Sequence, residues 1–98
     1  MEKIRTIHSR AFYLISCHRY YVFKGHKEYE ESIILTVKND GGTIDFVFTD
    51  STNNENISFI NPPSGEYIVP LKKGEKMKLV ITAKGAKGSY KIAKKIIK

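Results

Sequence analysis

The stretch that sets the fold class is ESIILTVKNDGGTIDFVFT, residues 31–49. Within it, β-branched and aromatic residues recur with the period of two that is typical of strands. The Asn-Asp-Gly-Gly run in residues 38–42 supplies the positive-φ positions that tight hairpin turns need. We therefore predict a β-hairpin in which Glu31–Val37 pairs with Thr43–Thr49. Its apolar face is expected to line the core with Ile33, Leu35, Val37, Ile44, Phe46 and Phe48.

A second hairpin is predicted near the C-terminus. Residues Lys76–Lys84 and Ser89–Ile97 again alternate apolar and polar side chains, and Gly85–Gly88 between them is typical of a turn. The alternation directs Met77, Leu79, Ile81, Ala83, Tyr90 and Ile92 toward the core.

Short strands are predicted between the hairpins, at Ile57–Ile60 and Tyr67–Leu71. Pro70 cannot donate to a ladder, so the second of these should lie at a sheet edge or be bulged. Residues 10–23 favour one or two strands, although the apolar spacing over residues 2–18 leaves a short N-terminal helix as the alternative. The resulting seven to eight strands, mostly antiparallel, predict an all-β chain. We expect one small β-sandwich or jelly-roll domain over its whole length.

Charge is distributed unevenly along the chain, whose total is +7. Residues 1–71 carry seven basic and nine acidic side chains, whereas residues 72–98 carry ten lysines and one acid, Glu75. No apolar run approaches the roughly 18 to 20 residues of a spanning helix, and none is long enough for a signal-peptide core. We therefore expect a cytoplasmic protein that does not enter a membrane. A single cysteine, Cys17, excludes an internal disulfide.

Several turn and tyrosine positions resemble those of bacterial pre-peptidase C-terminal domains. They are a Gly-Glu-Tyr strand start at Gly65–Tyr67, a Lys-Gly turn at Lys73-Gly74 and the ending Gly88–Ile92. The resemblance runs from Tyr20 to Ile92 and implies a jelly-roll-like accessory module. It carries over no site residues.

Motifs for catalysis and metal binding are not found in the sequence. Cys17 and His18 are neighbours, and in a strand adjacent side chains point to opposite faces, so they cannot form a catalytic pair. The three histidines match no zinc spacing, and Gly85–Ser89 holds the letters of a phosphate loop in the wrong order. We therefore predict no enzyme activity, no cofactor and no metal. A calcium- or carbohydrate-binding accessory module is an alternative, because the loop Asp50–Glu55 offers oxygen ligands.

Tyrosine suggests a binding role. Tyr20 and Tyr21 are neighbours in a predicted strand, so one of them must point outward, where its flat ring and polar tip suit recognition. We therefore interpret the chain as a non-enzymatic module that binds a protein partner through an edge strand or an end-loop surface that carries tyrosine. Pairing of edge strands between two copies would give a homo-oligomer.

The lysines of the second hairpin support a different hypothesis, electrostatic binding of nucleic acid. Alternation predicts that they share one outer face and form a basic stripe. The segment has no arginine, and no aromatic residue is expected on that face, so a stacking platform for single strands is not predicted. The lysines concerned are Lys76, Lys78, Lys84, Lys91 and Lys95.

Overall fold

The computed structural model describes residues 3–51 and 54–97, and within these ranges the chain forms five β-strands and no helix. All strand pairs are antiparallel, in the order β1-β5-β2-β3, and β4 also pairs with β2. The strands are β1 (Lys3–Lys24), β2 (Glu30–Asp50), β3 (Asn56–Ile60), β4 (Gly65–Leu71) and β5 (Lys76–Ile97).

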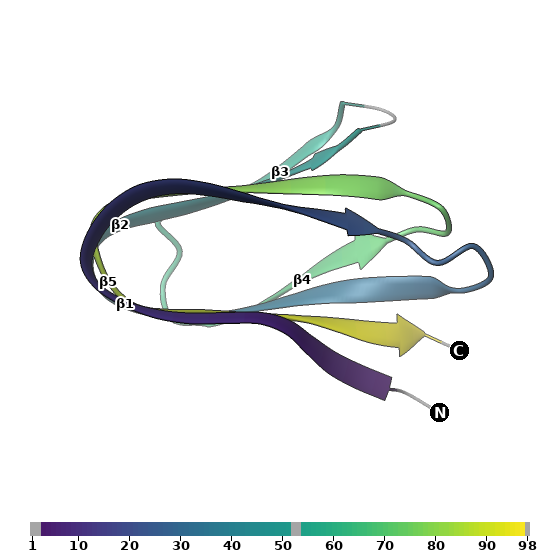
Figure 1. Cartoon of the computed structure of the whole chain (residues 1–98), viewed down its shortest axis with the longest axis horizontal. Coiled ribbons are helices and arrows are strands. Elements are labelled where there is room, and N and C mark those ends of the chain that lie inside the picture. Colours follow the sequence, from purple (N-terminus) through teal and green to yellow (C-terminus); the bar gives the residue numbers. More distant parts are fainter. Residues whose placement is uncertain (1–2, 52–53, 98) are drawn as a thin grey trace.

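Three of the strands are long enough to belong to two layers. β1, β2 and β5 bend together and fold the sheet over on itself (Figure 1). The first half of β2 pairs with β4, and its second half pairs with β3. Each layer therefore contains one short strand and one half of each long strand. Because each long strand was divided at its bend, the sequence predicted seven to eight strands where the structure has five.

The two predicted hairpins are wrong for the same reason. Residues 38–42 lie inside β2 and residues 85–88 lie inside β5, and the two halves of β2 both pair with β5 instead of with each other. Gly41 and Gly42 do have positive φ, 150° and 68°, as expected. Positive φ serves a bend within a long strand as well as a tight turn, and only the distant partner strand decides between them.

Backbone packs directly on backbone where β2 and β5 bend. A Cβ atom added to Gly42 would collide with the carbonyl oxygen of Gly85, and one added to Gly88 would collide with the carbonyl oxygen of Lys38. Glycine is therefore required at both positions for close approach as well as for φ.

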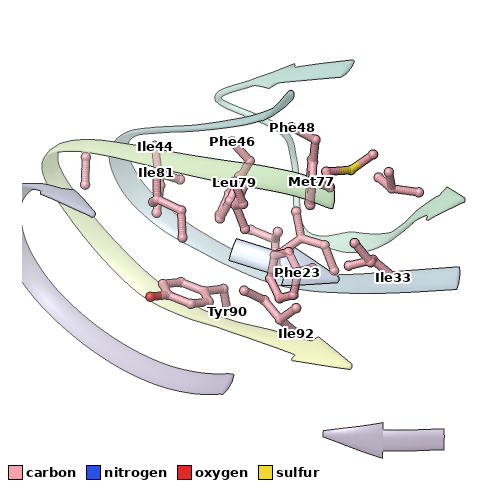
Figure 2. Close-up of a cluster of buried hydrophobic side chains, with 14 of the residues drawn as sticks. Phe23, Ile33, Ile44, Phe46, Phe48, Met77, Leu79, Ile81, Tyr90 and Ile92 are labelled. Carbon is pink, nitrogen blue, oxygen red and sulfur yellow. The ribbon is translucent and has the colours of Figure 1, made fainter. Parts of the chain in front are cut away.

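The inward faces of the strands were predicted correctly. All the apolar side chains assigned to the core are buried, and Phe46 and Leu79 are fully so. Figure 2 shows the labelled side chains lying between the two layers. Pro70 lies in β4, which pairs only with β2, so its edge position is confirmed.

The N-terminal helix is not formed, because residues 3–24 are one continuous strand; Glu2 lies outside the described residues. Pairing of this segment with β5 along its whole length overrides the apolar spacing that suggested a helix. In the part of the chain that the structure describes, no helix is long and apolar enough to cross a membrane.

Candidate functional site

The two tyrosines singled out by the sequence point in opposite directions. Tyr20 lies on the outer face of its layer with 61% of its surface exposed. Tyr21 points between the layers, and its hydroxyl lies 2.8 Å from the hydroxyl of Tyr90. The prediction that one of the pair is exposed is confirmed, and the other links the two layers.

The predicted lysine stripe is divided between two faces. Lys76, Lys78 and Lys84 lie on the outer face of the layer that contains β3. Lys91 and Lys95 lie on the outer face of the other layer, because β5 bends between the two groups. The expectation of one shared face is therefore wrong.

An aromatic ring does share a face with part of this lysine set, contrary to expectation. The Lys78 Nζ lies 4.9 Å from the centre of the Tyr20 ring. Tyr20 belongs to β1, whose pairing with β5 places it beside these lysines. Local alternation within β5 gave no information on that neighbour.

The oxygen-rich loop is only partly within the described residues. Thr52 and Asn53 lie outside them, and no group of three or more metal-ligating side chains occurs in the remainder of the described chain. Asp50 and Glu75 are both buried. Burial, followed by a hydrogen bond with Asp50, raises the pKa of Glu75. This carboxyl pair favours a bound proton at the end of β2.

Cys17 and His18 do point to opposite faces of β1. Cys17 is a partly buried free thiol that packs against the core. His18 is exposed, and its Nδ1 lies 3.3 Å from the hydroxyl of Thr82. The two side chains do not form a catalytic pair.

The β1 edge is the longest exposed strand edge of the described molecule. β1 pairs with β5 on one side only. Register shifts interrupt that pairing at three places before Cys17, and from Cys17 to Lys24 the register is continuous. We call Cys17–Lys24 the regular edge segment. The exposed large hydrophobic residues all lie on edge strands, and five of the eight are on β1: Ile4, Tyr13, Leu14, Tyr20 and Val22.

All three arginines of the chain lie on β1 and belong to its inner face. Arg5, Arg10 and Arg19 are paired with Lys94, Tyr90 and Ile81, which face the interior. The Nη1 of Arg10 is buried and has no hydrogen-bond partner among the described residues. A hydrogen bond with Tyr21 raises the pKa of Arg19. Sequence reasoning missed this set, although the restriction of arginine to residues 5–19 was a visible signal.

A pocket of about 540 Å³ opens next to the first half of β1. The buried carboxylate of Glu31 lies in it, 3.7 Å from the Lys94 ammonium, and accepts a hydrogen bond of 3.2 Å from the backbone N–H of His26. The Lys94 ammonium and the Glu31 carboxylate in this pocket are thus already paired with each other. The lining residues are Arg5, Ile7, His8, Tyr29, Glu31, Lys94 and Ile96.

Comparison with protein-family models and with curated protein sequences finds no match to this chain. Among solved structures, the chain is similar to a protein of Bacillus endospore appendages, which form disulfide-linked pili. The TM-score is 0.50 and the identity 11%, over 98% of this chain and 86% of that one. It is also similar to the P-domain of Macrobrachium rosenbergii nodavirus, with a TM-score of 0.41 and 16% identity over 98% and 92% of the two chains.

The first of these similarities confirms a β-sandwich-like, all-β fold and nothing about function. The second is too weak to support a conclusion. The likeness to pre-peptidase C-terminal domains has no matching family model behind it and still depends on turn and tyrosine spacing alone.

Proposed function

We propose that this protein is a non-enzymatic β-sandwich that binds a protein strand along the regular edge segment, Cys17–Lys24. The observation that carries the proposal is an uninterrupted strand edge flanked by exposed apolar side chains. Tyr20 and Val22, which point outward from this segment, are 61% and 50% exposed.

Strand addition uses groups that such an edge leaves free. Alternate residues of an edge strand direct their N–H and C=O groups away from the neighbouring strand, where an incoming strand can pair with them. Side chains on the two faces then contact those of the added strand and provide selectivity. Elsewhere on β1 the register shifts disturb the edge, which is a common protection against unwanted pairing.

A second copy of the chain is one partner to test beside a foreign strand. The Bacillus appendage protein with a similar fold forms pili. Antiparallel pairing of two regular edge segments, centred on Tyr21, would place Tyr20 of one copy opposite Val22 of the other on the same outer face.

The test is a selection of phage-displayed nonapeptides on the purified protein, with sedimentation velocity of the protein alone. We expect either extended peptides or a second copy to bind the wild type. The double variant Tyr20→Lys with Val22→Lys places charges along the edge and should abolish that binding. Ile60→Lys is the matched control, because Ile60 is exposed to a similar degree, at 67%, but lies on β3. The proposal fails if neither peptide nor second copy binds, or if Ile60→Lys has the same effect as the double variant.

One observation favours a second candidate function, binding of single-stranded nucleic acid. The Lys78 ammonium lies over the Tyr20 ring, and Lys76 and Lys84 share this outer face. An aromatic ring among lysines is the usual arrangement for base stacking next to phosphate contacts.

Filter binding of oligothymidylate across a salt series would test this candidate. We expect affinity that falls steeply with salt and that is lost in Tyr20→Ala. Charge reversal of Lys91 and Lys95, on the opposite outer face, should leave it unchanged. Absence of salt-dependent binding by the wild type would exclude the candidate.

A further inference from the structure

We propose that Arg10 and Arg19 together bind a carboxylate side chain of the strand that adds to β1. This inference rests on the strand addition proposed above and specifies its partner, an extended segment with an Asp or Glu on the side that faces the sandwich interior.

The first observation is an unsatisfied donor. The Nη1 of Arg10 is buried and has no acceptor among the described residues. A charged donor removed from water without a partner is costly, and an incoming acceptor relieves that cost. Buried polar groups without partners are uncommon in native structures, so this one requires an explanation.

The second observation is that the Arg19 guanidinium, like that of Arg10, lies near the hydroxyls of Tyr21 and Tyr90. Arg10 is paired with Tyr90 in one layer, and Arg19 lies two residues before Tyr21 in the other. The hydroxyls of Tyr21 and Tyr90, 2.8 Å apart, join the layers at this point. Burial, followed by the hydrogen bond with Tyr21, raises the pKa of Tyr90, while the charges of Arg19 and Arg10 both act to lower it. The two arginines thus flank one pair of hydroxyls.

The third observation is the charge of the strand itself. Residues 3–24 contain five lysines and arginines and no Asp or Glu. Two ion pairs join Lys38 to Asp40 and Lys94 to Glu31, and neither involves an arginine. β1 itself therefore supplies no anion to Arg10 and Arg19, and a carboxylate on a binding partner would match them.

A carboxylate on an added strand fits this requirement best. Neighbouring strands place directly opposed residues on the same face, so every second residue of the added strand would lie beside Arg19 and Tyr21. The planar guanidinium fork matches a carboxylate with two parallel hydrogen bonds. Arg5 differs, because it lines the pocket in which Glu31 already provides a carboxylate.

The experiment compares two blocked nonapeptides of alternating Thr and Val, one with Glu and one with Gln at the centre. Affinity is measured by calorimetry, and the position of binding by amide hydrogen exchange. The Nε–Hε signals of the three arginines are followed by NMR, with free glutarate as the probe for a small anion. We expect protection of residues 17–24 by both peptides, and about tenfold or greater preference for the Glu peptide. The Arg10 and Arg19 signals should shift with the Glu peptide alone.

Variants assign the preference to individual arginines. Arg10→Met and Arg19→Gln should each remove most of the preference, and Arg5→Gln should retain it. If Arg10→Met fails to fold, Arg19→Gln decides the outcome, because Arg19 is exposed.

Two results separate this inference from the proposed function. Equal affinity for the two peptides, with residues 17–24 protected, would overturn the role of the arginines and leave strand addition standing. Protection by neither peptide would overturn strand addition. In that case, shifts of Arg10 and Arg19 with glutarate would assign the site to a free small anion and also reject the peptide.

Discussion

The β1 edge runs for 22 residues along both layers, whereas the opposite edge is divided between β3, with five residues, and β4, with seven. Hydrogen bonds between β2 and the turn that follows β3 hold the β3 and β4 edge in place. The backbone N–H of Asn61 donates to Asp45 at 2.9 Å, and the Asn39 side chain donates to the carbonyl of Pro62 at 2.8 Å. Pro70 removes a donor from β4.

The two edges therefore differ in how their unpaired backbone N–H and C=O groups are protected. Short strands, a proline and side-chain bonds to the turn protect the β3 and β4 edge. The β1 edge relies on register shifts over its first part and has none between Cys17 and Lys24. The regular edge segment is therefore the part of the molecule best suited to accept a strand.

The largest expected effect concerns how firmly each edge is attached to the core. Phe23 of β1 is 3% exposed, and Phe23→Ala should cost about 3 to 5 kcal/mol by loss of burial and formation of a cavity. Phe59 of β3 is only partly buried, so Phe59→Ala should cost roughly half as much. Chemical denaturation of both variants measures the difference. Equal costs would show that the edges are equally well anchored.

The next effect concerns the bend that lets β1 and β5 run through both layers. Gly88 has φ of 141° and pairs with Phe12, and Gly88→Ala should cost about 1 to 3 kcal/mol from strain alone. Gly65, at the start of β4, has ordinary space around it, so Gly65→Ala should change stability by less than about 0.5 kcal/mol. Thermal unfolding of the two variants provides the comparison. An unchanged unfolding temperature for Gly88→Ala would mean that the bend can relax to accept a side chain.

A smaller difference in stability is expected between removing the Tyr21 hydroxyl on β1 and removing the Tyr67 hydroxyl on β4. Tyr21→Phe removes the bond to Tyr90 between the layers and should cost about 0.5 to 1.5 kcal/mol. Tyr67 donates to the Pro63 carbonyl at 2.6 Å in an exposed position, so Tyr67→Phe should cost at most about 0.5 kcal/mol. Urea denaturation distinguishes them, and a larger loss for Tyr67→Phe would reverse the assigned roles.

The smallest effect is a pH dependence at the end of β2. The pKa of Glu75 is raised in the folded state above its ordinary 4.5 by burial and by Asp50. The folded state therefore binds this proton more tightly, and its contribution to stability is complete below pH 4.5 and is lost as pH rises through the folded pKa. Glu75→Gln should remove that dependence. Melting temperatures from about pH 4 to about pH 7 test it, and identical profiles for the two proteins would refute the assignment.

Local patterns were sufficient for the inward faces and insufficient for the pairing. Ile33, Phe46 and Leu79 were assigned to the core from alternation alone, which depends only on the strand period. The role of Gly41–Gly42 was misassigned, because a hairpin turn and a bend use similar dihedral angles. The choice between them depends on β5, whose residues are some 40 positions distant in sequence.

The candidate site was less predictable than the fold. An outward-facing tyrosine in the pair Tyr20 and Tyr21 was recognised, without deciding which of the two it is, because adjacent residues of a strand must face opposite ways. Arg10 and Arg19 were not, because their approach depends on a bend in β1 near Leu14, which has φ of 50° without being a glycine. A strand with no visible turn residue gives no local sign that it folds back on itself.

Amide hydrogen exchange of the wild type, free and saturated with a selected peptide or at a concentration where copies associate, tests the central claim most directly. Because backbone pairing protects the amides that it engages, we expect slower exchange on binding in residues 17–24. Residues 56–60 and 65–71, on the opposite edge, should exchange as in the free protein. Protection confined to the β3 and β4 edge, or binding with no protection of either edge, would contradict strand addition at β1.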